Sequence, residues 1–589
     1  MTRISRLPAV LGGLGAVVVL GVGASLAVGG TDNPTNNVRA ALDGSKPKNV
    51  IFLLGDGMGT QEITAARYYA VGAAGKLNVD RMPFTGFDKT WSVKPAAAAP
   101  YLPDYDPDSA STGTEWATGR KTLDERISQG PSSAISVPGE NYKTVLEEWQ
   151  AAGKKVGDVS TAEITDATPA VLASHISLRG CQGPANMGSC ASERKGAGGL
   201  GSIAEQEVDH KVDVLLGGGR DRFTATIPDG PDATKSVVQS AQDKGYQYVT
   251  DATGLDAVTD KGKPVLGLFN AGNMTTEFSQ SAPSALGAGT TTTCNESARP
   301  ASEPSLPAMT SKALSLLEND KGFFLQVEGA SIDKQDHATS ACGQIGETIA
   351  FDKAIGVALD YQQLHPDTLV VVTADHAHTS QIVSEDATGT GLPTGYSTNL
   401  VTKDGQTLSL TYGTAGYNSA SPGSAPVATP PSQQHTGSVV PIWGIGPQGS
   451  AVLGTNDHTD LFDLLRGAKV AQAAPSTTTT VTQTQTVTGP TTTVSVPAKP
   501  GKPRVGLAVG SGATRKSGVS VSVAAVDAKG VKVTLKQGTK TISSKSLQSH
   551  GGIAHLPATK AKKGAVKVSV TATGTGGTAT ASATTTLKK

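Results

Sequence analysis

The sequence is poor in aromatic residues and in cysteine, and after its N-terminal segment it has no apolar run long enough to span a bilayer. Only 4% of the 589 residues are aromatic, but 37% are hydrophobic, so the chain can still bury a large core. A chain of this length is expected to hold more than one domain. The lack of a second long apolar run excludes a protein that crosses the membrane several times.

The four cysteines are Cys181, Cys190, Cys294 and Cys342, and none belongs to a C-x-x-C pair. The absence of such pairs argues against a zinc ribbon. An even number of cysteines in an exported chain indicates two disulfides. Three connectivities are open, and local pairing, Cys181–Cys190 and Cys294–Cys342, is the simplest of them.

The formal net charge at pH 7 is zero, because 50 basic residues balance 50 acidic ones. The balance hides an asymmetry. Residues 501–589 carry 15 Lys or Arg and a single acid, Asp527, which gives a local net charge of +14. The molecule therefore combines an acidic body with a basic tail.

The N-terminus has the layout of a secretory signal, with Arg3 and Arg6 before an apolar run from Pro8 to Val28. The two arginines are not adjacent, which argues against a twin-arginine signal. We expect residues 1–30 to be a signal peptide or, because the run could span a membrane, an uncleaved N-terminal anchor. Either form predicts an exported protein that is secreted, periplasmic or associated with the cell envelope.

No nucleotide-binding motif is present, since the glycines between Gly55 and Gly59 match neither the Walker nor the dinucleotide pattern. They lie between an apolar strand, Asn49–Leu54, and a helical pattern, Gln61–Ala70, which is how an α/β unit begins. Further strands are expected at 155–159, 213–216, 265–269, 321–326 and 368–373, and helices at 144–152 and 461–468. We predict an α/β domain over 48–470, with a central, mostly parallel sheet flanked by helices, after a flexible lead-in at 31–47.

Carboxylates and histidines gather just beyond the ends of three of these strands. In open α/β sheets, binding sites form beyond the carboxyl ends of strands. Each residue alone could be a helix cap or a core residue, but the repetition indicates one shared site. Carboxylate and imidazole together suit zinc. The residues are Asp56 after the first strand, Glu328, Asp333 and His337 after the strand at 321–326, and Asp375 with His376 after the strand at 368–373.

The composition changes near residue 471. Residues 471–503 are rich in Thr and Pro and predict a stalk-like linker. Residues 504–589 contain segments that alternate with period two, Gly518–Ala525, Val531–Leu535 and Ala565–Thr571, which predicts a small antiparallel β-sandwich. This basic domain has no cysteine and no clustered acids, so we assign it no catalysis.

From about Asn49 to Ala468 the chain resembles the bacterial alkaline phosphatases. The matching stretches, in the order in which the family has them, are N-V-I-F-L-L-G-D-G-M-G, D-S-A, S-T-A-E-I-T-D-A-T-P-A, G-F-F-L-Q-V-E-G-A-S-I-D-K-Q-D-H-A, V-T-A-D-H-A-H-T-S-Q-I-V and Q-H-T-G-S. The resemblance implies hydrolysis of phosphate monoesters to an alcohol and inorganic phosphate through a covalent phosphoserine. It also implies a homodimer of the catalytic domain.

The resemblance implies two Zn²⁺ and one Mg²⁺ per subunit. Ser109 is then the nucleophile, and its oxygen needs a metal to hold it as the alkoxide. Oxygen ligands for magnesium fit the preference of a hard cation. The implied ligands are Asp56, Asp375, His376 and Ser109 for one zinc; Asp333, His337 and His435 for the other; and Asp56, Thr168 and Glu328 for magnesium.

Four further residues have implied roles around these ions. Arg179 resembles the arginine whose planar fork grips two phosphate oxygens. Asp166 would contact magnesium-bound water, and Lys334 would reach phosphate through water. His378 would orient the carboxylate of Asp333. The other histidines, His175, His210, His365 and His458, match no ligand position and are interpreted as surface or core residues, and Asp336 as a solvated or capping residue.

Several alternatives stay open at this point. A related phosphodiesterase or sulfatase of the same superfamily, or a non-enzymatic surface-binding protein, would share much of the pattern. The segment at 387–434 is predicted to be a long loop that could alter substrate range. The basic tail could bind anionic polymers of the cell envelope or lipid headgroups, or could be a well-solvated module without a partner. No nucleic acid specificity is expected.

Overall fold

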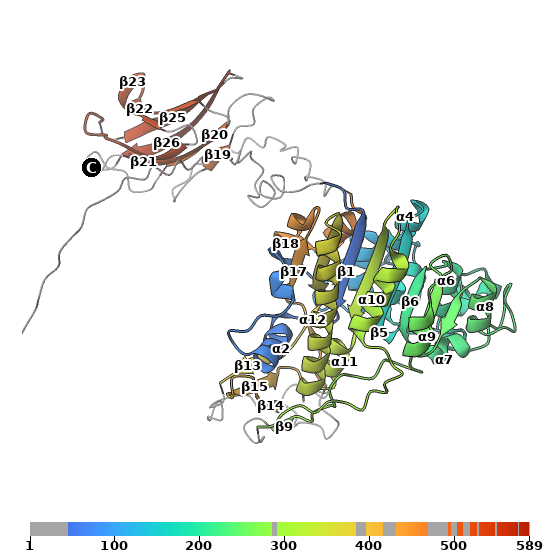
Figure 1. The fold of residues 1–589 in the computed structure, drawn as a ribbon. Helices are drawn as coiled ribbons and strands as arrows, with labels where there is room; N and C mark the ends of the chain where they lie inside the picture. The colour runs from blue at the N-terminus through green and yellow to red at the C-terminus, as the bar shows by residue number, and fades with distance from the viewer. Residues whose placement is uncertain are drawn as a thin grey trace, which may run out of the picture. The chain divides into compact units, whose positions relative to one another are not determined.

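The computed structural model describes residues 45–285, 291–384, 396–415 and 432–468 of the body, and residues 493–495, 504–509, 519–526, 529–547, 551–562, 564–574 and 577–587 of the C-terminal part. The chain forms two compact units, one spanning Val38–Ala474 and one that contains Pro475–Lys589 (Figure 1). The predicted signal or anchor, the lead-in before residue 45 and nearly all of the linker lie outside the described residues. Among the described residues, no helix is both long and apolar enough to cross a membrane.

The larger unit is built on a ten-stranded sheet of order β18-β2-β17-β11-β1-β10-β5-β6-β8-β7. The seven strands from β11 to β7 all run parallel, and only β17 is antiparallel to its neighbours. The predicted mostly parallel sheet is therefore confirmed. The strands are β1 Asn49–Gly55, β2 Phe84–Lys89, β5 Lys155–Glu163, β6 Val214–Gly218, β7 Gln247–Val249, β8 Val265–Leu268, β10 Phe323–Gly329, β11 Thr368–Ala374, β17 Val440–Ile445 and β18 Gly454–Asp457.

The central strands are buried on both faces, as the near-continuous apolar runs predict. In β1, Val50, Phe52 and Leu54 belong to one core cluster, and Ile51 and Leu53 belong to the other. The first cluster packs against α3, α4, α5, α6, α8 and α13, and the second against α10 and α12. Helices thus cover both faces of the sheet (Figure 1).

The helix bounds follow the capping residues. Thr144 caps α4 through a reciprocal bond with Glu147, and Asp457 caps α13, which therefore begins three residues before the predicted Leu461. The helices are α2 Thr60–Val71, α3 Ser109–Thr118, α4 Val145–Ala151, α5 Ala167–Ala173, α6 Ile203–Asp209, α7 Arg220–Thr224, α8 Val237–Asp243, α9 Ala252–Ala257, α10 Leu306–Leu317, α11 Ser331–His337, α12 Ala341–Leu364 and α13 His458–Leu465. Short 3-10 turns are η1 Val79–Arg81, η2 Pro184–Asn186, η3 Ala191–Glu193, η4 Lys195–Ala197 and η5 Gly449–Val452.

The segment predicted to be a long loop contains two strands in its described part. They join a four-stranded antiparallel sheet of order β13-β15-β14-β9, so the loop prediction is wrong for residues 396–401 and 407–412. The alternation in T-L-S-L-T-Y was a strand signal hidden among Ser and Thr. The smaller strands are β3 Ser92–Val93, β4 Pro103–Asp104, β9 Ser284–Ala285, β12 Ala377–His378, β13 Ser380–Val383, β14 Tyr396–Val401, β15 Thr407–Tyr412 and β16 His435–Thr436.

The smaller unit consists of two four-stranded antiparallel sheets, ordered β19-β20-β21-β24 and β23-β22-β25-β26. Alternate residues such as Val531, Val533 and Leu535 fill one core cluster with Val566, Val568 and their neighbours. The predicted small antiparallel β-structure is thus present. Its strands are β19 Thr493–Ser495, β20 Arg504–Val509, β21 Val519–Val526, β22 Gly530–Gln537, β23 Lys540–Leu547, β24 Gly551–Leu556, β25 Gly564–Gly574 and β26 Gly577–Leu587.

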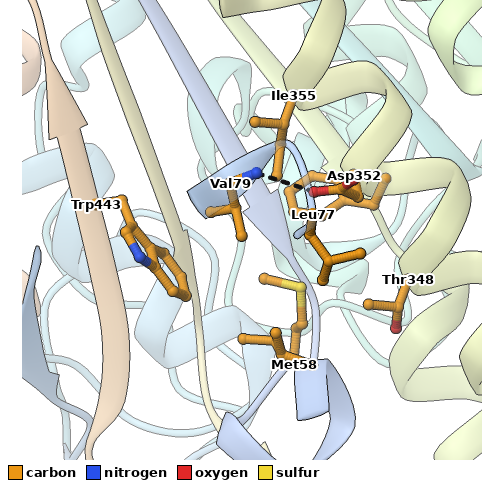
Figure 2. A pocket seen from close by; sticks show the side chains of 9 residues that line it. Met58, Leu77, Val79, Thr348, Asp352, Ile355 and Trp443 are labelled. Carbon is orange, nitrogen blue, oxygen red and sulfur yellow. Dashed lines mark hydrogen bonds between the residues drawn. The ribbon is translucent and has the colours of Figure 1, made fainter. Parts of the chain in front are cut away.

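A small cavity in the larger unit lies between α12, η1 and Met58, and Trp443 also lines it (Figure 2). Its volume of about 10 Å³ leaves room for one water-sized sphere. Asp352 on its wall accepts the backbone N–H of Val79 at 3.0 Å and that of Asn78 at 2.9 Å. The carboxylate therefore holds η1 against α12, and the cavity is too small for a substrate.

Candidate active site and metal centre

The site forms where three neighbouring parallel strands end together. Gly55 at the end of β1 lies opposite Gly329 of β10 and Ala374 of β11. Asp56 and Asp375 therefore leave the sheet side by side, and the backbone N–H of Gly57 donates to Asp375 Oδ1 at 2.9 Å. Gly57 has φ +69°, and a Cβ there would lie 2.6 Å from His378 Cδ2, so this turn needs glycine. The shared edge of the sheet brings together carboxylates that are more than 300 residues apart in the sequence.

Ser109 lies at the first position of α3, facing the end of β1. Its hydroxyl is 3.4 and 3.3 Å from the two carboxylate oxygens of Asp56 and 3.3 Å from His376 Nε2. His376 Nε2 is in turn 3.2 Å from Asp375 Oδ2. Ser109 is buried, and the first N–H groups of a helix carry partial positive charge that favours an anion. The Ser109 hydroxyl thus contacts one carboxylate and one imidazole, and the carboxylate of Asp375 contacts the same imidazole.

Asp333 is the centre of a second group. Its Oδ1 lies 2.6 Å from His378 Nε2, 3.3 Å from His435 Nε2 and 3.4 Å from His337 Nε2. The ring of His435 also stacks on that of His376, with centroids 3.6 Å apart. The second group is therefore adjacent to the first, as two metal sites that act on one substrate require.

The outer nitrogens of two of these histidines bond to backbone carbonyls. His337 Nδ1 lies 2.7 Å from the carbonyl of Gln433, and His435 Nδ1 lies 3.1 Å from that of Pro107. These bonds place the proton on Nδ1 and leave a lone pair on each Nε2. The two Nε2 atoms are only 3.0 Å apart, and two lone pairs at that distance repel unless one ring is protonated or a cation lies between them. This donor set fits zinc.

Glu328 and Thr168 are the remaining residues predicted to hold magnesium. Glu328 lies one residue before the end of β10 and accepts a short hydrogen bond from the Ser160 hydroxyl of β5. The hydroxyl of Thr168 is buried and has no hydrogen-bond partner among the described residues. A buried hydroxyl without a partner is costly, and an oxygen-binding cation would satisfy it. These oxygen donors fit magnesium better than zinc.

Asp166, Arg179 and Lys334 form a network at the edge of the metal residues. Asp166 caps α5 and accepts Arg179 Nη2 at 3.0 Å and Lys334 Nζ at 2.6 Å. Arg179 Nη1 also donates to Asp108, which caps the helix of Ser109, at 3.2 Å. The side chains of Arg179 and Lys334 remain 24% and 22% exposed, so an anion can reach them from solvent. Because the two cations outweigh its burial, the pKa of Asp166 lies below its usual range.

The acids of the site cannot all carry charge without cations. Burial raises the pKa of Asp56 well above its usual range, that of Glu328 to about 8 and that of Asp375 to about 6, and neighbouring carboxylates add to the rise. Burial lowers the pKa of His376 well below its usual range, which favours the neutral imidazole that binds metal. Buried, like-charged carboxylates of this kind are stabilised by divalent ions.

The structure shows where Asp336 and the four histidines without a predicted role lie. Asp336 is neither solvated nor a cap: it is buried, and Gln433 Nε2 donates to its Oδ1 at 3.0 Å. Burial, with Glu62 as the next cause, raises its pKa well above the usual range and so favours its neutral form. Of the histidines without a predicted role, His458 is a core residue and His365 stacks on Tyr361 at the surface. The other two, His175 and His210, converge on Glu147 away from this site.

The sequence missed the groups that orient the ligands. Ser160 holds Glu328, and the carbonyls of Pro107 and Gln433 hold His435 and His337. Ser160 lies inside the S-T-A-E-I-T-D stretch, so its position there was a usable signal. Every residue has a backbone carbonyl, so the side-chain pattern could not indicate that those of Pro107 and Gln433 hold the two histidines.

Both disulfides have the predicted local pairing, Cys181–Cys190 and Cys294–Cys342. The first closes a loop two residues after Arg179, and the second anchors α12 five residues after His337. Each therefore restricts the backbone close to a residue of the site.

Removing the disulfides one at a time should destabilise the larger unit unequally. The Cys294–Cys342 link spans 48 residues and the Cys181–Cys190 link spans 9. Loop-closure entropy then predicts losses of about 4 and about 3 kcal/mol, respectively. Denaturant unfolding of the two double Cys→Ser variants measures both losses of stability. A larger loss on removing Cys181–Cys190, which closes the shorter loop, would contradict the entropic account.

Comparisons with known proteins agree with this geometry. A family described as "Alkaline phosphatase" matches residues 47–471. The chain is 42% identical over 446 residues to a streptomycin-6-phosphate phosphatase of Streptomyces griseus, covering 74% of this chain and 93% of that protein. It is also 42% identical over 448 residues to the alkaline phosphatase of Escherichia coli, covering 74% and 89%. The solved alkaline phosphatase of Thermus thermophilus shares the fold at 21% identity and a TM-score of 0.50, covering 72% of this chain and 92% of that one.

Proposed function

Since the chain belongs to the alkaline phosphatase family and is therefore a phosphoric monoester hydrolase, we propose that Ser109 is its nucleophile and that the surrounding residues hold two zinc ions and one magnesium ion. The observation that carries the proposal is the contact of the Ser109 hydroxyl with both Asp56 oxygens and His376 Nε2. A free serine is a weak nucleophile, so it needs neighbours that favour its alkoxide.

The ligands divide by chemistry into three sets. Mixed carboxylate and imidazole donors suit zinc, and carboxylate with hydroxyl suits magnesium. When bound, the cations supply Lewis acidity and neutralise the charge of the serine oxygen and the phosphate. We assign Asp56, Ser109, Asp375 and His376 to one zinc, Asp333, His337 and His435 to the second, and Asp56, Thr168 and Glu328 to magnesium.

The protein's own groups position the substrate for an in-line displacement. In the first step the bond from Ser109 Oγ to phosphorus forms while the bond from phosphorus to the ester oxygen breaks. The hydroxyl of Ser109 loses its proton, the ester oxygen gains one, and the alcohol leaves. In the second step water attacks phosphorus on the side opposite Oγ and the bond from phosphorus to Oγ breaks. One proton of the water passes to Oγ, which leaves free Ser109 and inorganic phosphate. Arg179 can offer two N–H groups to the phosphate, while Asp166 holds both Arg179 and Lys334 in place. His378 keeps the carboxylate of Asp333 oriented.

The substrate preference tests this function directly. A monoester dianion can present oxygens to both zinc positions and to Arg179, whereas a diester carries a second organic group on one of these oxygens and has one negative charge fewer. We expect kcat/KM for p-nitrophenyl phosphate to exceed that for bis-p-nitrophenyl phosphate by at least about 100-fold, equivalent to roughly 3 kcal/mol. Comparable or reversed values, or a preference for p-nitrophenyl sulfate, would favour the phosphodiesterase or sulfatase alternative.

Replacing Arg179 with lysine should weaken phosphate binding. Lysine keeps the charge but loses the planar fork, so one of two charge-assisted hydrogen bonds is lost. We expect the inhibition constant for inorganic phosphate to rise 10- to 100-fold, because a hydrogen bond to a charged group contributes about 1.5–3 kcal/mol to binding. Arg222→Lys is the matched control, since Arg222 pairs with Glu163 outside the metal residues and should change the constant less than about threefold. Equal effects of the two variants would remove Arg179 from the phosphate site.

The two disulfides suit an oxidising compartment, and we propose that the protein is exported. The N-terminal run would then act either as a cleaved signal or as an anchor. N-terminal sequencing of the protein recovered from the envelope and the culture medium distinguishes the two. Recovery of all the protein in the cytoplasm would contradict export. Dimerisation of the larger unit stays a prediction, for which sedimentation equilibrium is the measurement.

For the basic C-terminal unit we propose binding to an anionic polymer of the cell envelope. On the outer face of the β22–β25 pair, the exposed Lys536 lies directly opposite the exposed Lys567, with the exposed Lys532 on the same face. Like charges opposite one another are unfavourable unless an anion lies between them. The full chain should be retained on immobilised poly(glycerol phosphate) at low salt, and a variant with all three lysines changed to glutamate should not. No retention of the unaltered chain would end this proposal.

A further inference from the structure

A second group of metal-binding side chains lies outside the active site. Glu147, His175 and His210 each offer one ligand atom, and the three atoms lie within 4.8 Å of one another. Glu147 is in the first turn of α4, His175 follows α5, and His210 caps the C-terminus of α6. None of them is among the residues assigned to catalysis, and no sequence motif joins them.

The contacts converge on one carboxylate oxygen. Glu147 Oε1 lies 3.1 Å from His210 Nε2 and 3.3 Å from His175 Nε2. Four ligands around a zinc ion at 2.0–2.1 Å are separated by about 3.3 Å along the edges of a tetrahedron. Both separations therefore have the length expected between two ligands of the same zinc ion.

The outer nitrogens of both histidines are already engaged. His175 Nδ1 lies 3.0 Å from the carbonyl of Ser128, and His210 Nδ1 lies 3.0 Å from that of Gln206. A neutral imidazole bound in this way carries its proton on Nδ1 and a lone pair on Nε2. Both lone pairs then face the same carboxylate oxygen, and this is stable only if the rings are protonated or a cation lies between the three atoms. The carbonyl–histidine arrangement is the same one that orients His337 and His435.

The surrounding bonds hold the three side chains in place without using the converging atoms. Glu147 Oε2 accepts the backbone N–H of Thr144 at 2.8 Å, which leaves Oε1 free to point at the histidines. Gln206 fixes the backbone of His175 from both sides, accepting from its N–H at 2.9 Å and donating to its carbonyl at 3.2 Å. The cluster is thus preorganised, and binding a metal requires little rearrangement.

The cluster of Glu147, His175 and His210 is partly buried, but solvent can reach it. The side chain of His175 is 6% exposed, whereas those of Glu147 and His210 are 21% and 23% exposed. A cation can therefore enter from solvent, and water can complete a fourth ligand position. Two imidazoles and one carboxylate select zinc or a similar transition metal over magnesium or calcium.

We propose that Glu147, His175 and His210 form an additional binding site for a divalent transition metal, with zinc preferred, separate from the catalytic ions. The ion links α4, α6 and the segment that leads from α5 to Arg179. It stabilises the fold of that region and takes no part in the reaction.

The zinc content of the purified holoenzyme tests the proposal. The protein, its His210→Gln variant and a His365→Gln control are dialysed against micromolar zinc, and bound zinc per chain is measured by mass spectrometry. His365 is the matched control because it is a partly exposed histidine beside one acid, Glu318, at 3.7 Å. We expect one zinc fewer per chain in His210→Gln than in the unaltered protein and the control, with hydrolysis of p-nitrophenyl phosphate unchanged.

A second variant tests whether misfolding, and not the loss of a ligand, accounts for the loss of zinc. Glu147→Gln can still accept the Thr144 N–H and so preserves the cap of α4, while it loses the charged ligand. It should also lose one zinc, and saturating zinc should raise the melting temperature of the unaltered enzyme by several degrees more than that of either variant. Equal zinc contents in the unaltered protein and Glu147→Gln would overturn the proposal and leave the cluster as a protonated His–Glu network.

Discussion

Ser109→Ala is expected to lower kcat for p-nitrophenyl phosphate by at least about 1,000-fold, which corresponds to roughly 4 kcal/mol of lost transition-state stabilisation. The reason is that the variant has no oxygen to form the covalent intermediate. Residual turnover should come from water in the charged site, because its acids and histidines stay in place.

The matched control is Ser111→Ala, two residues along the same helix. The Ser111 hydroxyl bonds to the carbonyl of Asp108 and to Asp124, and no contact joins it to Asp56 or His376 among the described residues. Its activity should stay within about threefold of the unaltered enzyme. An undiminished rate in Ser109→Ala, or equal losses in both variants, would remove Ser109 from the role of nucleophile.

Asp333→Asn should have an effect of similar size, because Asp333 is the shared contact of three imidazoles. The substitution preserves shape but removes the negative charge, so the second zinc position loses its only carboxylate ligand. We expect kcat to fall by about 1,000-fold and bound zinc to fall by one equivalent per chain. Activity assays in zinc-supplemented buffer, together with metal analysis, measure the two effects separately.

Asp336→Asn provides the comparison from the same helix. Asp336 is also buried, but burial raises its pKa and favours the neutral acid, so a neutral amide of the same shape should be tolerated. Zinc content should be unchanged and kcat should fall less than about fivefold. If Asp336→Asn lost zinc and Asp333→Asn retained it, the assignment of the second zinc position would be wrong.

The sequence predicted the centre of the fold well because that centre depends on local patterns. The apolar runs of β1, β10 and β11 are long, are followed by glycine or acidic residues, and are buried on both faces in the structure. The parallel arrangement then places their ends at one edge, so ligands distant in sequence could be expected to meet. The family resemblance supplied what the pattern could not, notably Ser109 and His435.

Features that depend on tertiary contacts could not be predicted from the sequence. The strands β14 and β15 are rich in Ser and Thr, and they exist because they pair with each other and with neighbouring strands. Asp336 is a carboxylate one residue from the predicted ligand His337, and only the structure shows that it is buried and bonded to Ser380 and Gln433. The Glu147–His175–His210 cluster joins three segments with no shared spacing, so nothing in the chain order pointed to it.

Direct trapping of the covalent intermediate tests the central claim most sharply. The metal-loaded enzyme is mixed with an excess of phosphate-labelled p-nitrophenyl phosphate, quenched with acid within milliseconds and digested for peptide mapping. The account predicts label on the peptide that contains Ser109, present as phosphoserine and absent in Ser109→Ala. Label on another residue of a fully active enzyme, or labelling of Ser109→Ala equal to that of the unaltered protein, would contradict it.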